Sequence, residues 1–167
     1  MNAKEFALEA LERARTVTMM TIDGLTPEHF HWRPKPGANS IAFLLWHVSR
    51  VEDRFMSELR NTEEIWLTEE WHKKFTVPIS ENGIGWGPQQ IQEFKPAMEL
   101  VVSYLQRTRD VSLVTIRELD LVQFKEQLTS ARPDFTVANT LQTIVYHENH
   151  HQGAIGYVYG MAYGSSQ

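Results

Sequence analysis

Apolar residues in this chain recur every three or four positions and nowhere alternate over a sustained stretch. A period near 3.6 predicts helices, whereas a period of two would predict strands. The clearest seam consists of Ile41, Leu44, Val48, Val51 and Phe55. The pattern therefore predicts an all-α chain. At 167 residues, the chain is expected to form one domain, residues 1–167.

Four long helices account for the periodic segments, and irregular connectors separate them. The predicted helices are 3–22, 41–59, 89–118 with a bend near Pro96, and 136–163, with a shorter helix inside 63–75. Asn39 or Ser40 is expected to cap the second helix, and Thr136 the fourth. The predicted fold is a four-helix bundle, up-down-down-up or similar, with long connectors.

The start of the second helix is apolar all round. Phe43, Leu45 and Trp46 lie off the seam that the other apolar residues form. A helix of this kind is central in its fold or buried between subunits. Because a monomer would expose Phe43 and Trp46, we expect a homodimer that buries part of this helix.

Composition and charge exclude several classes of protein. The net charge of -5 argues against a nucleic-acid binder, which needs a basic face. The longest apolar run, IAFLLW, is far too short for a membrane span. The N-terminal stretch carries Glu5 and Glu9 where a signal peptide would be basic and then apolar, so we expect a cytoplasmic protein.

The chain contains no cysteine, which removes disulfides, thiolate ligands and a cysteine nucleophile. Histidines and carboxylates must therefore bind any metal. Any thiol chemistry would need a small-molecule thiol from outside the chain.

The stretch YHENHHQG, residues 146–153, contains a literal H-E-x-x-H motif. On a helix, His147 and His151 fall on the same face as Ile144, Ala154 and Val158 and point into the bundle. The pair by itself is weak evidence for a site. Its buried position strengthens the case, because two buried imidazoles are costly unless they are bonded.

A zinc protease of the H-E-x-x-H type is disfavoured. Such enzymes take a third ligand downstream, and the residues after His151 include no His, Asp, Glu or Cys. The metzincin extension would need Gly and His where this chain has Ala154 and Tyr157. The third ligand must therefore come from upstream.

The upstream candidates are His29, His31, His47 and His72. We favour His47, because it lies in the most apolar stretch of the second helix, and we take His72 to be a surface residue. His47, His147 and His151 would hold one divalent metal and leave a position open for water or substrate. Three imidazoles suit zinc or nickel best, and also tolerate cobalt and iron.

Some neighbouring residues have weaker assignments. Glu148 is expected to orient a metal ligand by hydrogen bonding or to join two helices, and a solvated Glu148 is the alternative. Glu52 could play the same part as Glu148. Asp53 is interpreted as surface charge. The glycines Gly153, Gly156 and Gly160 are expected to let the last helix approach its neighbours closely.

The chain resembles the DinB/YfiT-like superfamily of metal-dependent bacterial proteins. The resemblance rests on LTPEHFHWRPKPGANSIAFLLWHVSRVEDR, on IWLTEEWHKKF followed by GIGWGPQQI, and on HENHHQG. It implies a four-helix bundle, commonly dimeric, whose metal is held by one histidine of the second helix and two of the last. By position these are His47, His147 and His151. Some relatives are S-transferases or isomerases that use low-molecular-weight thiols.

The chain departs from the family at one place. Relatives often read H-H-R-G-Q where this chain has His150, His151, Gln152, Gly153 and Ala154. The resemblance implies a metal-dependent enzyme that activates a low-molecular-weight thiol against a small-molecule substrate. The alternatives are a non-catalytic metal- or ligand-binding protein of a stress response, a hydrolase that uses metal-bound water, and a purely structural bundle. Beyond the metal ligands, no catalytic residue is assigned.

Overall fold

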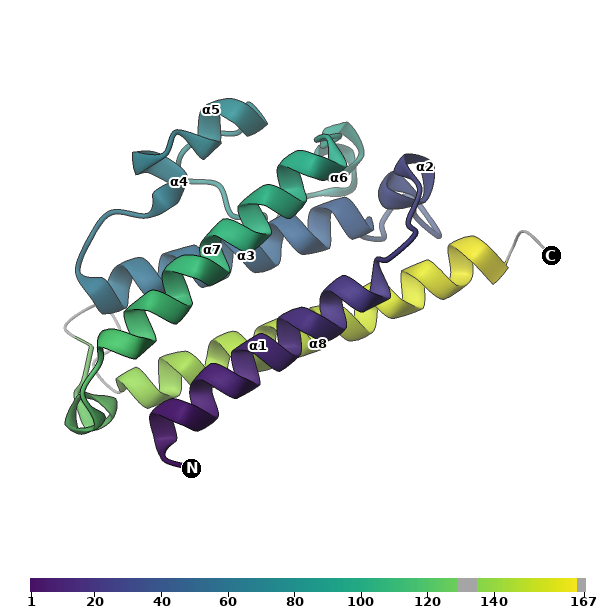
Figure 1. Cartoon of the computed structure of the whole chain (residues 1–167). Coiled ribbons are helices and arrows are strands. Elements are labelled where there is room, and N and C mark those ends of the chain that lie inside the picture. The colour runs from purple at the N-terminus through teal and green to yellow at the C-terminus, as the bar shows by residue number, and fades with distance from the viewer. Residues whose placement is uncertain (129–134, 165–167) are drawn as a thin grey trace.

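The structure is a computed structural model that describes residues 1–128 and 135–164, and its long helices form a four-helix bundle (Figure 1). In chain order the elements are α1 (Ala3–Thr21), α2 (Pro27–His31), α3 (Ile41–Arg60), α4 (Ile65–Thr68), α5 (Trp71–Phe75), α6 (Pro88–Glu93), α7 (Met98–Glu118), the 3-10 helix η1 (Leu121–Lys125) and α8 (Val137–Gly164). The all-α prediction is confirmed.

The four long helices follow the up-down-down-up order. In Figure 1, α1 and α8 run in one direction while α3 and α7 run in the other. Helix α3 contacts both α7 and α8, and α1 contacts the same two helices. Helices α3 and α8, which carry the predicted ligands, are therefore antiparallel neighbours.

Side-chain caps fix the starts of the two helices that carry the histidines. The hydroxyl oxygen of Ser40 accepts a hydrogen bond from the backbone N–H of Phe43, at 3.2 Å. The hydroxyl oxygen of Thr136 accepts from the N–H of Asn139 at 3.2 Å, and the Asn139 side chain accepts from the N–H of Thr136 at 3.1 Å. These bonds satisfy backbone donors that lack partners at a helix start. Ser40 and Thr136 are thus the caps.

Two predicted helices are divided in the structure. The segment 89–118 is not one bent helix, because α6 ends at Glu93 and α7 begins at Met98. Pro96 has no N–H to donate and disfavours helical geometry in the residue before it, so the chain is extended there. The segment 63–75 is divided at Glu70, whose φ of 57° is left-handed.

Helix α3 is central because residues 83–94 cover its start. Phe43 and Trp46 are 4% and 0% exposed. The rings of Trp86 and Phe94 lie 5.0 and 4.8 Å from the Trp46 ring. Gly83, at φ 87°, passes so close that a Cβ there would lie 2.8 Å from the Phe43 ring. The prediction that Phe43 and Trp46 lie in a subunit interface is therefore wrong, and the dimer loses that support.

The glycines on the exposed side of α8 do not bring the helix close to a neighbour. Added Cβ atoms at Gly153 and Gly160 would meet nothing within 4 Å, and one at Gly156 would only touch Thr21 at 3.8 Å. The predicted close approach through these glycines is wrong.

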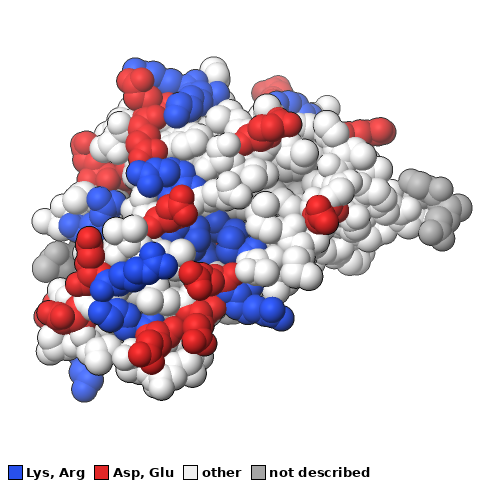
Figure 2. Space-filling view, in the orientation of Figure 1, with Lys and Arg blue, Asp and Glu red and all other residues white. Residues whose placement is uncertain are grey.

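Figure 2 shows both signs of charge intermingled towards one end of the molecule and few charged residues around the C-terminal half of α8. A membrane span would need a longer apolar stretch than any described helix offers.

Candidate metal centre

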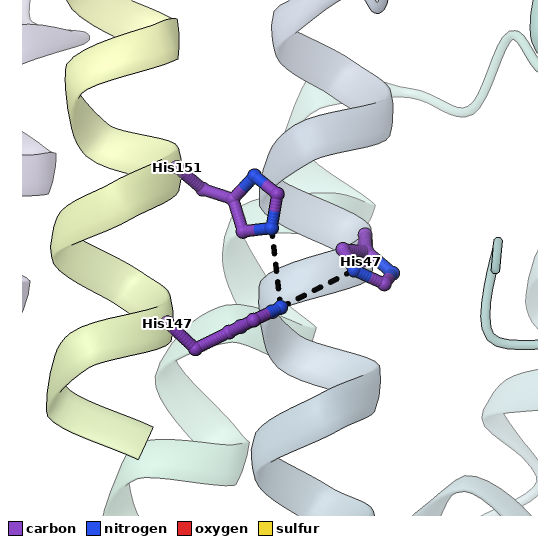
Figure 3. A group of neighbouring side chains, drawn as sticks. All are labelled: His47, His147 and His151. Carbon is purple, nitrogen blue, oxygen red and sulfur yellow. Dashed lines mark hydrogen bonds between the residues drawn. The ribbon is translucent and has the colours of Figure 1, made fainter. Parts of the chain in front are cut away.

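Three imidazoles meet between α3 and α8. His47 comes from α3, and His147 and His151 come from successive turns of α8 (Figure 3). The Nε2 atom of His147 lies 3.3 Å from Nε2 of His47 and 3.1 Å from Nε2 of His151. All three offer ligand atoms within 4.8 Å of one another. The structure thus brings together the three histidines selected from the sequence.

The spacing of these nitrogens suits a metal ion. With metal–nitrogen bonds of about 2.05 Å, a tetrahedral ion holds its ligand nitrogens about 3.3 Å apart. The separations of 3.1 and 3.3 Å lie close to that value. Two of the three separations thus match the spacing of ligands around one ion, and the group could hold a metal.

One hydrogen bond fixes which nitrogen of His47 is available. Nδ1 of His47 lies 2.5 Å from the backbone carbonyl oxygen of Asn82. Because a carbonyl only accepts, Nδ1 must carry the hydrogen, and the lone pair of the neutral ring is then on Nε2. Histidine ligands in metal sites commonly donate their other N–H in this way. The Phe43 ring lies parallel to the His47 ring, at 1° and 5.9 Å between centroids, and shields that side.

Burial keeps the three imidazoles neutral. Removal from water lowers the pKa of His47 below its usual value. Burial, followed by the neighbouring His151 and His47, lowers the pKa of His147 to about 3. Burial and His47 lower the pKa of His151 to about 4. At neutral pH all three rings therefore present lone pairs, the form that a metal requires.

The remaining histidines, His29, His31, His72 and His150, lie outside the three-histidine group. His72 is half-buried and faces the carbonyl oxygen of Trp66 at 3.0 Å, so it is less exposed than predicted. His150 is exposed, as expected for a residue off the inner seam.

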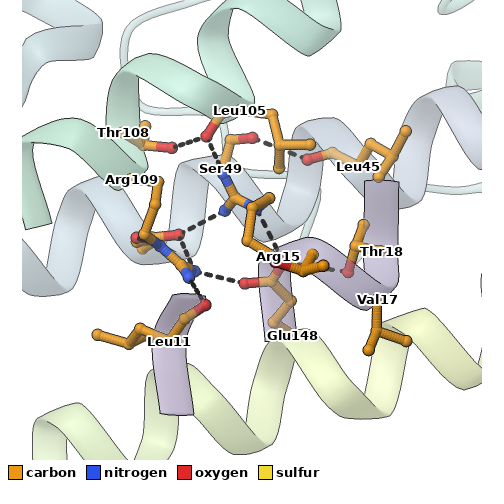
Figure 4. Close-up of polar contacts among 12 residues, drawn as sticks. Leu11, Arg15, Val17, Thr18, Leu45, Ser49, Leu105, Thr108, Arg109 and Glu148 are labelled. Carbon is orange, nitrogen blue, oxygen red and sulfur yellow. Dashed lines mark hydrogen bonds and ion pairs between the residues drawn. The ribbon is translucent and has the colours of Figure 1, made fainter. Parts of the chain in front are cut away.

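Two carboxylates near the histidines belong to a buried ion network (Figure 4). Arg15 donates to Glu148 and to Glu52, both at 2.9 Å. Arg109 donates to Glu52 at 2.8 Å and also to Glu148. Each of α1, α3, α7 and α8 contributes one of these four residues, which we call the charged quartet.

The charged quartet is closed and shielded from solvent. Glu52 and Glu148 are each 1% exposed, so the interpretation of Glu148 as solvated is wrong. Although burial disfavours its charge, Arg109 and then Arg15 lower the pKa of Glu52 to about 2. The described contacts of both carboxylates run to the arginines and nearby hydroxyls, and none runs to an imidazole. A role in orienting the metal ligands remains a prediction for Glu52 and Glu148.

Arg15 and Arg109 are not among the predicted site residues, although the sequence carries a signal for both. Arg15 lies between Leu11 and Thr18 at helical spacing, and Arg109 follows the buried Leu105 by one turn. An arginine on a buried seam needs an acidic partner from another helix. Two carboxylates on facing helices would have completed that inference.

Asp53 also differs from its prediction. It is 4% exposed and accepts hydrogen bonds from the backbone N–H groups of Ile65 and Trp66, at 3.0 and 2.9 Å. The Tyr104 hydroxyl donates to it at 2.7 Å. Burial raises the pKa of Asp53 to about 6. Its interpretation as surface charge is wrong, because it holds the start of α4 against α3.

These features define a helical bundle in which two antiparallel helices present three histidines able to hold a metal ion. The chain belongs to the DinB superfamily, whose family model matches residues 10–155. The fold is similar to a crystal structure described as the conserved protein of locus from Enterococcus faecalis. The TM-score is 0.84 and the identity 21%, with 98% of this chain and 99% of that chain covered. No protein with a curated description matches the chain.

Proposed function

We propose that one divalent cation, zinc or nickel, binds to His47, His147 and His151, and that the bound metal serves catalysis with a small thiol. The observation that carries the proposal is the convergence of three Nε2 atoms at 3.1 and 3.3 Å, with Nδ1 of His47 bonded elsewhere. Two of the rings are half-buried rather than sealed, which leaves an approach for a further ligand.

A cation at this position would lower the pKa of a thiol bound to it and favour the nucleophilic thiolate. The chain supports such chemistry in two ways. Its buried imidazoles stay neutral, and it has no cysteine of its own that could compete for the metal. The thiol would be a low-molecular-weight compound and the reaction an S-transfer or isomerisation. A cytoplasmic location would suit this use of a reduced thiol.

An open recess of about 490 Å³ lies between the connector that precedes α3 and the C-terminal half of α8, and none of the three histidines lines it. Leu44, one turn before His47, and Ala154, one turn after His151, both line it. Val158 adds apolar surface and Lys35 adds a positive charge at the recess. We place the body of a small-molecule substrate there, with its reactive atom directed towards the histidines.

Metal analysis of protein purified without an affinity tag tests the first part. We expect one metal per chain, and substitution of His47, His147 or His151 by alanine should abolish binding. His150→Ala and His72→Ala are matched controls and should keep wild-type occupancy. Full occupancy in His47→Ala would reject the site.

A panel of thiols with an epoxide or a chloro-nitro-arene tests the chemistry. The metal-loaded protein should conjugate a thiol with an apparent pKa below the free-thiol value of about 8.5, and the chelated protein should be inert. Ala154→Leu should narrow the recess and slow bulky electrophiles while metal occupancy stays unchanged. A cobalt-loaded protein whose spectrum no thiol perturbs would reject the thiol proposal.

Two alternatives remain distinct outcomes of the same panel. A hydrolase would cleave esters without a thiol, with an apparent pKa near 7 from metal-bound water. A non-catalytic binder would load metal and show neither activity. The binder is favoured by Gln152, which stands where relatives often have arginine and donates to the Thr21 hydroxyl at 3.0 Å. Its side chain thus joins α8 to α1.

We also propose a homodimer, through a face other than the one predicted from α3. An apolar groove of about 400 Å³ lies between α1 and α8. Phe6 and Tyr146 line the groove and are 61% and 67% exposed. Glu148 is the one Asp, Glu, Lys or Arg residue of α8, and it is buried. The exposed side of α8 therefore carries no such charge that would repel a second copy of the chain.

A further inference from the structure

The segment that covers His47 is tied to α3 at two successive carbonyl groups. The carbonyl oxygen of Asn82 lies 2.5 Å from Nδ1 of His47. The carbonyl oxygen of the preceding residue, Glu81, accepts a hydrogen bond from Nε of Arg50 at 3.1 Å. His47 and Arg50 are three residues apart and thus lie on one face of α3. Each therefore binds one of two adjacent peptide groups.

Arg50 is itself held in a single orientation. Its Nη1 atom donates to Glu64 at 2.5 Å and to the Tyr104 hydroxyl at 3.2 Å. Its guanidinium group lies 4.4 Å from the centre of the Trp66 ring. The side chain is almost fully buried, with 2% exposed. An arginine held by several contacts can fix the position of a segment to which it donates a hydrogen bond.

The covering segment has further contacts that limit its freedom near these carbonyls. The Asn82 side chain accepts from the N–H of Ile84 at 2.9 Å. The indole N–H of Trp86 donates to the Glu81 carboxylate at 2.6 Å. Gly83, at φ 87°, lies directly against the Phe43 ring. These contacts shape the segment, and the Arg50 bond is the one that joins the Glu81 carbonyl to α3.

We propose that Arg50 is a positioning residue for the metal centre. By holding the Glu81 carbonyl, it keeps the adjacent Asn82 carbonyl against Nδ1 of His47, so that the lone pair on Nε2 faces His147. The consequence for metal affinity rests on the proposed function, whereas the consequence for the His47 tautomer does not.

The test compares Arg50→Met with Arg107→Met. Methionine keeps much of the length of arginine but cannot donate. Arg107 is a matched control, because it is 45% exposed and pairs with Glu69 on the surface. Zinc affinity is measured by competition with a chromophoric chelator, and the His47 tautomer by histidine ¹⁵N spectra of the metal-free protein at pH 7.

We expect wild type and Arg107→Met to hold His47 mainly in the form protonated on Nδ1. Arg50→Met should mix the two tautomers and weaken zinc binding by roughly tenfold or more, as for lost ligand-orienting contacts elsewhere. Arg50→Lys, which can still donate to Glu81, should recover part of the affinity. If Arg50 only stabilised the fold, Arg50→Met would lower the melting temperature but leave the His47 tautomer and the zinc affinity unchanged. That result would overturn the proposal.

Should Arg50→Met fail to fold, Glu64→Gln weakens the hold on Arg50 from a partly exposed position, and it should shift the tautomer in the same direction. An unshifted tautomer in a folded Glu64→Gln protein would count against the proposal. Should wild type bind neither zinc nor nickel, the proposed function fails, and the tautomer comparison still decides the role of Arg50.

Discussion

His147 occupies the middle of the three imidazoles, and its position makes it the hardest of them to protonate. Two other rings direct nitrogen atoms at its Nε2, and water reaches it poorly. In the unfolded chain the same residue titrates like any histidine. The difference between the two states links the stability of the protein to pH.

The metal-free protein should lose stability as the solution becomes acidic. The pKa values of His147 and His151 are lowered to about 3 and about 4 in the folded state, from 6.5. Above pH 6.5 neither state binds these protons, so the full stability is present. Below it, the unfolded chain takes up protons that the folded chain refuses, and the free energy of unfolding falls. Urea midpoints measured in chelator should decline steadily from pH 6.5 to 4.

The double variant His147→Gln, His151→Gln is the control for this dependence. It removes both titrating groups and should flatten the decline over that pH range. A decline as steep as that of wild type would show that other groups cause it.

Gly83 and Gly160 should respond in opposite ways to alanine. At Gly83 a Cβ would lie 2.8 Å from the Phe43 ring on a backbone with φ 87°. We expect Gly83→Ala to lower the free energy of unfolding by about 2–4 kcal/mol through backbone strain and overlap. Gly160 is helical and faces open space, so Gly160→Ala should raise it by about 0.5–1 kcal/mol. Equal midpoints in urea for the two variants would contradict this.

At the scale of elements, the charged quartet joins all four long helices at one level. Along α8, Ile144 belongs to one apolar cluster and Ile155 to another, and Glu148 lies between them. The quartet and the three imidazoles thus form a polar layer across the bundle. Such a layer penalises any sliding of one helix along another, because a shift would leave a buried charge without its partner.

Glu148→Gln should therefore be strongly destabilising. It removes one charge and leaves Arg15 and Arg109 with a single buried carboxylate. We expect the free energy of unfolding to fall by about 3–5 kcal/mol. The matched control is Glu69→Gln, which breaks the solvent-exposed pair with Arg107 and should cost about 0–1 kcal/mol. Similar losses in urea denaturation would show that the quartet adds little.

The long helices and the three-histidine group could be predicted because both follow the helical period of the sequence. His147 and His151 share a seam with apolar residues, and His47 lies in the most apolar helix. What covers Phe43 and Trp46 could not be predicted, since residues 76–87 have no period and the contacts of Trp86 and Phe94 with Trp46 are tertiary. The contact between His47 and the Asn82 carbonyl could not be predicted either, because every residue type has a backbone carbonyl.

At the scale of the whole molecule, the bundle should not depend on metal to fold. Apolar clusters lie on both sides of the polar layer and include fully buried residues such as Trp46 and Leu11. Metal at one hundred times its dissociation constant would add about 2.7 kcal/mol. A chelator should lower the melting temperature and leave the helical circular dichroism intact. Loss of the helical signal on chelation would contradict this expectation.

Sedimentation velocity tests the proposed dimer. Wild type should sediment as a species of twice the 19.4 kDa chain mass. Phe6→Glu places a charge in the α1–α8 groove and should give monomers, whereas Val114→Glu, at an exposed position of α7, should not. A wild-type species of single chain mass at micromolar concentration would reject the proposal.

The charged quartet also limits how its four positions can change during evolution. Loss of any one member strands buried charge at about 3–5 kcal/mol, a large share of the 5–15 kcal/mol that keeps a typical domain folded. Mutations at Arg15, Glu52, Arg109 and Glu148 would therefore seldom survive singly. Lineages should either inherit the four together or have exchanged them together for apolar side chains. In a family alignment, these four positions would then be retained or replaced together.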